Sequence, residues 1–98
     1  MLQYQEMTEP LSAPEARELI RTILRSGTVS FSGHAEREME SDALLKVDVE
    51  NVLRGGAVGE GEFENGSWRY RVFTQKITVV VALRSEVRLV VVTAWRNR

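Results

Sequence analysis

Apolar residues in the first half of the chain recur with the period of an α-helix. In the stretch SAPEARELIRTILRSG they follow the i, i+3, i+4, i+7, i+8 spacing of one helical face, at Ala16, Leu19, Ile20, Ile23 and Leu24. Ser12 followed three residues later by Glu15 is the pattern of a capping box, and Gly27 is a typical helix stop. These signals predict a helix from Ser12 to Gly27.

Two further helices are predicted before residue 57. The stretch TVSF is typical of a short strand or an extended link, and Ser32 after it is a good N-cap for a helix of about two turns through Met39. The stretch VDVENVLRGG predicts a third helix that ends at Gly55 and Gly56. Its inward positions are Val49, Val52 and Leu53.

The rest of the chain is rich in β-branched residues and has the alternation of strands. We expect strands at about 57–64, 67–74, 77–84 and 87–96, with Asn65-Gly66 as a type I′ hairpin turn. Short links between them predict a four-stranded antiparallel meander with the helices packed on it, which is an α+β fold. Residues 1–11 are interpreted as a flexible N-terminal segment and residues 12–98 as one domain.

A period of two residues divides the strand side chains between two faces. It places Tyr70 opposite to Arg69 and Arg71. In the last strand it assigns one face to Val87, Leu89, Val91, Thr93 and Trp95, and the other to Arg88, Val90, Val92, Ala94 and Arg96. Because the central strands are apolar on both sides, we expect the second face of the sheet to be shielded from water as well. A partner protein is one candidate for that role.

Composition narrows the function classes. The 98 residues are 43% hydrophobic and 28% charged, and there is no cysteine, which excludes disulfides and thiolate sites. The longest apolar run, ITVVVAL, is too short to span a membrane, and the first residues do not resemble a signal peptide, so we expect a cytoplasmic protein. Eleven of the 13 basic residues are arginine, which suits phosphate binding or reflects a compositional bias.

The candidate chemistry centres on the single histidine. No nucleotide-binding or hydrolase motif is present, and no spacing predicts a metal site or a cofactor. His34 lies at the start of a predicted helix, where its ring is either bonded to a backbone carbonyl or free to transfer a proton. Cleavage of RNA through its 2′ hydroxyl needs such a proton-transfer group, together with cations that stabilise the phosphorane.

Two groups of charged residues have alternative interpretations. Arg17, Arg21 and Arg25 follow one another at i, i+4 along the first helix, as a cationic ridge or as an ordinary solvated face. Three acids, Glu60, Glu62 and Glu64, alternate along a predicted edge strand, where charges discourage pairing with other chains.

The segments GTVSFSGHAEREM, VENVLRGG, ENGSWRYRV and LVVVTAWR, in this order, resemble a widespread bacterial family of domains of unknown function. That family is grouped by fold with the RelE-like and barnase-like ribonucleases, and the layout also resembles the MqsR type of toxin that cleaves messenger RNA. The resemblance implies a RelE-like superfold and a metal-independent endoribonuclease toxin that acts on single-stranded RNA and pairs with an antitoxin protein.

The family pattern places the candidate catalytic groups at His34, Arg69, Arg71 and Arg96. His34 would be the general base or acid, and the arginines would hold and neutralise the scissile phosphate. The candidate substrate-binding residues are Tyr70, Arg37 and Thr93. Two alternatives remain open: a non-catalytic module that binds a protein or forms a homodimer through the second face of the sheet, and a phage-derived inhibitor of a host enzyme.

Overall fold

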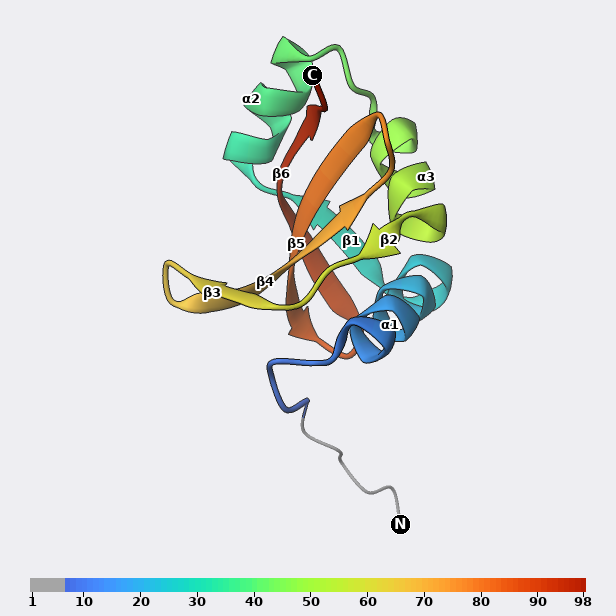
Figure 1. Ribbon diagram of the computed structural model, residues 1–98, viewed down its shortest axis with the longest axis vertical. Coiled ribbons are helices and arrows are strands. Elements are labelled where there is room, and N and C mark those ends of the chain that lie inside the picture. The colour runs from blue at the N-terminus through green and yellow to red at the C-terminus, as the bar shows by residue number, and fades with distance from the viewer. Residues whose placement is uncertain (1–6) are drawn as a thin grey trace.

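The structure of the protein is a computed structural model in which residues 7–98 are described (Figure 1). The helices are α1 (Ala13–Ser26), α2 (Gly33–Ser41) and α3 (Lys46–Gly55). The strands are β1 (Thr28–Phe31), β2 (Ala57–Val58), β3 (Glu62–Glu64), β4 (Ser67–Phe73), β5 (Ile77–Ser85) and β6 (Arg88–Arg96). The predicted α+β class is confirmed with its three helices, but the sheet has six strands where the sequence predicted four.

The helices begin and end where the capping signals predict. The Ser12 side chain accepts a hydrogen bond from the Glu15 N–H, and the Glu15 carboxylate accepts one from the Ser12 N–H, so the capping box of α1 is formed. Ser32 caps α2 by accepting from the Ala35 N–H at 3.0 Å. Gly56 is the C-cap of α3, as the glycine pair predicts.

The sheet is mixed, and the prediction of a purely antiparallel meander was wrong. Strands follow the order β1-β6-β5-β4-β2, and β3 also pairs with β4. The pairs β4–β5 and β5–β6 are antiparallel as expected, whereas β1 pairs parallel with β6, with Thr28 opposite Arg88. The partner of β1 lies far away in the sequence, so local alternation carries no signal for this pairing.

The predicted strand 57–64 is broken in the middle. Because β2 pairs with the end of β4 and β3 with its beginning, residues 59–61 face only residues 70 and 71, and one residue is extra. At Gly61 an added Cβ would lie 2.9 Å from the Tyr70 ring. The break thus includes a position where a side chain larger than that of glycine would meet the Tyr70 ring. The hairpin turn that follows is as predicted, since Asn65 and Gly66 both have positive φ.

A second irregularity lies in β6 and changes which face its later residues occupy. The pairing of β6 with β5 skips Val92, so this strand contains one extra residue. Beyond it, Thr93 and Trp95 lie on the opposite face from Leu89 and Val91. The sequence placed all four on one face, and this prediction was wrong because a bulge reverses the alternation.

The core lies between one face of the sheet and the helices. In Figure 1, α1 and α3 lie on one side of the sheet and α2 lies beside β6. Fully buried side chains from the helices meet fully buried side chains from β4, β5 and β6, among them Ile20, Ile23, Val49, Leu53, Val72, Val81, Leu89 and Val91. Burying such side chains is the main term that stabilises the domain.

Helix α2 is fastened at both ends to the part of β6 that β1 does not cover. At its start, the Ser32 hydroxyl donates to the Val92 carbonyl at 3.0 Å. At its end, the Asp42 carboxylate accepts from the Arg96 N–H at 2.7 Å, and the Arg96 guanidinium donates to the Asp42 carbonyl at 2.8 Å. These bonds pair polar backbone groups of β6 and fix α2 relative to the sheet.

The segment before α1 is partly described. Residues 1–6 of the predicted flexible segment lie outside the described residues. Met7 and Leu11 pack against the core cluster, and the Leu11 N–H donates to the Tyr70 hydroxyl at 2.9 Å. Within residues 7–98, none of the helices has the length and apolar character needed to cross a membrane.

Candidate functional site

The face of the sheet opposite to α1 and α3 carries a groove of about 680 Å³, here called the open-face groove. Its polar lining consists of Ser32, His34, Glu64, Asn65, Arg69, Arg71, Arg84 and Thr93. Its apolar lining consists of Val80, Val90, Val92 and Trp95. Four of the residues singled out from the sequence, His34, Arg69, Arg71 and Thr93, therefore meet in one depression.

The strands bring the arginines to this face. Arg69 and Arg71 alternate with Tyr70 on β4, as the sequence predicts, and because Tyr70 is buried under the helices both arginines point away from them. They are paired across the sheet with Ala82 and Val80, which are 1% and 8% exposed. The apolar centre of the second face is thus shielded by neighbouring side chains of the same domain.

Thr93 reaches the groove only because of the bulge at Val92. Without the extra residue, Thr93 would share the face of Leu89 and Val91, as the regular alternation predicts. Trp95 is turned to the same face by the same irregularity, and its ring lies 6.0 Å from the Arg71 guanidinium, within the range of a cation–π contact.

His34 is the second residue of α2, and its side chain is exposed. The bonds of Ser32 to Val92 and to the Ala35 N–H set the start of the helix against β6, and this places His34 at the rim of the groove. No hydrogen bond joins the His34 ring to another residue within 7–98. The interpretation in which a backbone carbonyl holds the ring thus finds no partner in this part of the chain.

The arginines of the groove are paired only loosely. The Arg69 guanidinium lies 3.9 Å from the Glu64 carboxylate, and the Arg71 guanidinium lies 3.4 Å from that of Glu62. Both carboxylates are at least 60% exposed, so each pair contributes about 0–1 kcal/mol. A dianionic or polyanionic ligand can replace these acids at little cost. Glu62 and Glu64 were interpreted from the sequence as charges that protect an edge strand. In the structure they also pair with the arginines of β4.

Arg69 has an unsatisfied donor. Its Nε atom is buried and has no hydrogen-bond partner within the described chain, while its side chain is 20% exposed. Buried donors are nearly always paired in folded proteins, and an unpaired one points to a missing acceptor.

Sequence reasoning did not identify several groove residues. Arg84 was not identified because it lies near the end of an apolar strand, at a second shift in the pairing of β5 with β6. Asn65 was interpreted only as a turn residue, and Trp95 was assigned to the wrong face. Two features of the sequence could have pointed to these residues, the hairpin turn at Asn65 and the abundance of arginine. Neither feature shows that the residues lie in the same groove.

Three predicted site residues do not line the groove. Tyr70 is 0% exposed on the face that the helices cover, so it cannot stack on a base as predicted. The Arg96 guanidinium donates to the carbonyls of Asp42 and Ala43, which gives it a structural role at the end of α2. Arg37 is exposed on α2, outside the groove lining.

The hydroxyl of Tyr70 connects the segment before α1 to the sheet through two hydrogen bonds. It accepts from the Leu11 N–H and donates to the Glu9 carboxylate, both at 2.9 Å. Tyr70→Phe leaves the Leu11 N–H without its partner, so we expect the free energy of unfolding to fall by about 1–2 kcal/mol, measured by urea denaturation. Ligand binding in the open-face groove should be unchanged in the folded variant, and a large loss would return Tyr70 to the site.

The same tyrosine should give the protein a characteristic alkaline transition. Burial is the main cause that raises the pKa of Tyr70 from 10.0 to about 12, and Glu9 adds to it. The neutral phenol is therefore favoured by folding, so its contribution to stability is complete below pH 10 and is lost between pH 10 and about 12. Tyr70→Phe should remove this part of the pH dependence of unfolding.

Comparison with protein families places most of the chain in a known family. Residues 31–96 match the family described as Domain of unknown function (DUF4258). No curated protein and no solved structure matches the chain. Within residues 7–98, no group of three or more histidine, aspartate or glutamate side chains is arranged to hold a metal ion.

Proposed function

The chain belongs to the family of Domain of unknown function (DUF4258), and from its open-face groove we propose that it is an endoribonuclease that cleaves single-stranded RNA without a metal ion. The observation that carries the proposal is the meeting of one histidine with three arginines in a single groove. Positive charge attracts the phosphate backbone, and a histidine beside it can transfer protons.

The groove offers the contacts that single-stranded RNA requires. Arg69, Arg71 and Arg84 bind phosphate oxygens through their guanidinium groups. Trp95 provides an aromatic surface on which a base stacks, and Thr93 donates a hydrogen bond to a phosphate or a 2′ hydroxyl. Charge and stacking from one groove favour RNA over a small anion.

The reaction follows from the placement of these groups. The 2′ hydroxyl oxygen forms a bond to phosphorus, and the bond from phosphorus to the 5′ oxygen breaks. His34 accepts the proton of the 2′ hydroxyl, and the leaving 5′ oxygen takes a proton from water. Arg69 and Arg71 stabilise the charge that develops on the phosphorane. The products are a 2′,3′-cyclic phosphate and a 5′ hydroxyl.

The sequence motifs resemble those of the RelE-like and MqsR-like toxins, and we propose that the chain shares their superfold. It would then be the nuclease of a toxin-antitoxin system. It would cleave messenger RNA in the cytoplasm until an antitoxin protein binds it. All three helices precede strands β2 to β6, with the histidine on a helix and the arginines on the sheet, and this arrangement supports the proposal. Induced expression should then slow growth, and His34→Ala should relieve the effect.

The test is cleavage of a single-stranded RNA by the purified protein in the presence of a metal chelator. We expect fragments that end in a 2′,3′-cyclic phosphate, and no cleavage at a nucleotide whose 2′ hydroxyl is replaced by hydrogen. Cleavage of that deoxy position would contradict the mechanism. Intact RNA together with a stable homodimer would instead favour the non-catalytic protein-binding module.

A further inference from the structure

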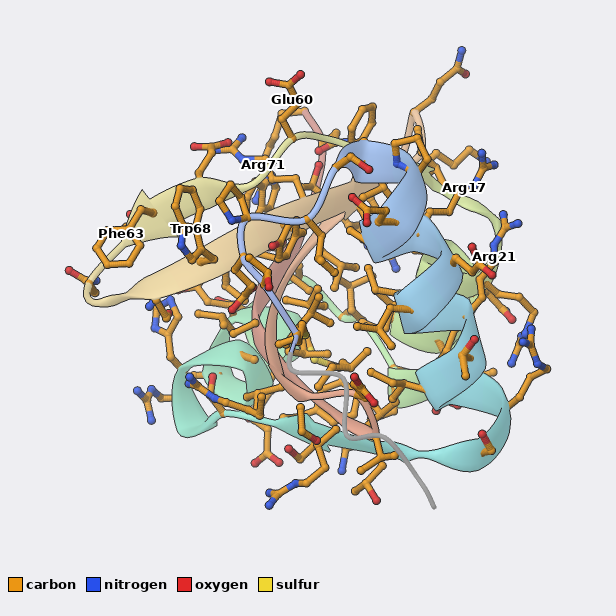
Figure 2. The ribbon with its side chains drawn as sticks, turned by 90° about the horizontal axis from the view of Figure 1, so that it is seen from below. Arg17, Arg21, Glu60, Phe63, Trp68 and Arg71 are labelled. Atoms are coloured by element: carbon orange, nitrogen blue, oxygen red, sulfur yellow. The ribbon has the colours of Figure 1, made fainter. Side chains whose placement is uncertain are left out.

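A second basic groove lies on the other side of the domain, along α1. It has a volume of about 440 Å³ and is lined by Arg17, Arg21 and Arg25 with Glu18, and by Ala57 and Val58 of β2. We call it the α1 groove. Figure 2 shows Arg17 and Arg21 projecting from the same side of α1, away from the hairpin that carries Phe63 and Trp68. The α1 groove and the open-face groove share no lining residue.

The three arginines of the α1 groove are not matched by acids. The ion pairs formed within residues 7–98 involve Arg69, Arg71 and Arg98, and none involves an arginine of α1. The Nε atom of Arg21 is buried and has no hydrogen-bond partner in this part of the chain. The excess of positive charge in the α1 groove favours an anionic ligand with oxygen acceptors.

The spacing of the arginines indicates the form of that ligand. Residues four apart on a helix are separated by about 6 Å along its axis. Every second residue of an extended peptide is separated by about 6.6–6.8 Å. Carboxylates at alternate positions of an extended segment therefore meet Arg17, Arg21 and Arg25 in turn, and each guanidinium can bind a carboxylate through two parallel hydrogen bonds.

The rest of the lining favours a peptide over RNA. Single-stranded RNA is held by aromatic rings on which its bases stack, and the α1 groove is lined by no aromatic residue of the described chain, in contrast to Trp95 in the open-face groove. Ala57 and Val58 instead offer apolar contact, and they belong to β2, the strand at the end of the sheet order. An edge strand has backbone groups available to a peptide.

We propose that the α1 groove is a docking site for an acidic extended segment of another protein, with aspartate or glutamate at alternate positions. The proposal does not depend on the activity of the open-face groove, because the two sites lie on different sides of the sheet. Binding at one should therefore leave the chemistry of the other unchanged.

The test uses a fluorescent synthetic peptide in which glutamate alternates with valine, and a control peptide of the same composition with its glutamates in one block. Fluorescence anisotropy should show tighter binding of the alternating peptide, weakened by added salt. Arg17→Glu and Arg21→Glu should each lower the affinity by about tenfold or more, which corresponds to about 1.4 kcal/mol. Arg54→Glu, an exposed arginine of α3 outside both grooves, is the matched control.

Equal affinity for the two peptides, or an equal loss in Arg54→Glu, would overturn the proposal. Binding of RNA that is lost in Arg17→Glu would also overturn it, by assigning the α1 groove to nucleic acid. Self-association that depends on these arginines, measured by analytical ultracentrifugation, would likewise overturn the proposal. Circular dichroism establishes that each variant is folded, and RNA cleavage measured in parallel separates this proposal from that of the open-face groove.

Discussion

Replacing His34 by alanine should lower the rate of RNA cleavage by about 10²–10⁴-fold, the usual contribution of a positioned proton-transfer group. The loss should appear in kcat at saturating RNA, because the variant keeps the groove arginines that we propose bind the phosphate. His34 is exposed, and its ring forms no hydrogen bond with a residue of the described range, so the free energy of unfolding should change by no more than about 0.5 kcal/mol. Single-turnover cleavage of an end-labelled RNA measures the rate.

Two controls make this result specific. Added imidazole should restore part of the activity of His34→Ala, because it fills the space left by the ring, whereas His34→Gln should stay inactive with and without imidazole. Glu38→Ala changes an exposed residue of the same helix outside the groove and should cleave at the normal rate. A His34→Ala variant as active as the unaltered protein would remove the histidine from the mechanism.

Arg69→Ala should lower kcat/KM for RNA by about 10²-fold or more, since it removes a donor to the developing phosphorane charge. Its Nε is buried and unpaired, so the substitution costs no internal hydrogen bond of that atom. Arg71→Ala should act in the same direction. Each variant should also reduce the salt dependence of RNA binding by about one unit of log K against log salt, as expected for one lost phosphate contact.

The acids opposite these arginines provide a test of the opposite sign. Glu64→Gln and Glu62→Gln remove the carboxylates that compete for Arg69 and Arg71, so RNA affinity should rise in both. Arg69→Lys keeps the charge but loses the planar fork of donors, and we expect an intermediate loss. Arg54→Ala is the neutral control. A loss in Arg54→Ala equal to that in Arg69→Ala would show a general charge effect and contradict a role for the groove.

The sequence was informative wherever a local signal determined local structure. Ser12 with Glu15, Ser32, and the glycines after α3 correctly predicted where helices begin and end, because a cap depends on residues within one turn. Asn65 and Gly66 likewise predicted their turn. The alternation on β4 correctly separated Tyr70 from Arg69 and Arg71.

The errors arose where long-range packing interrupts a regular period. The extra residue at Val92 reverses the face of Thr93 and Trp95, and another extra residue before β3 breaks the predicted strand next to Tyr70. Neither irregularity can be predicted from the residues next to it in the sequence. The candidate site was also predicted only in part. Residue types alone indicated His34, Arg69 and Arg71, whereas the presence of Thr93 beside them depends on the bulge at Val92.

The most direct test of the central claim, that the open-face groove binds and cleaves RNA, is a nuclear magnetic resonance titration with a single-stranded RNA whose 2′ hydroxyls are all methylated. Such an RNA binds but offers no nucleophile, so the complex persists. We predict chemical-shift changes at the His34 ring, the Trp95 indole and the backbone of Arg69 and Arg71, while α1 stays unchanged. Changes confined to α1, or no changes at all, would contradict the account.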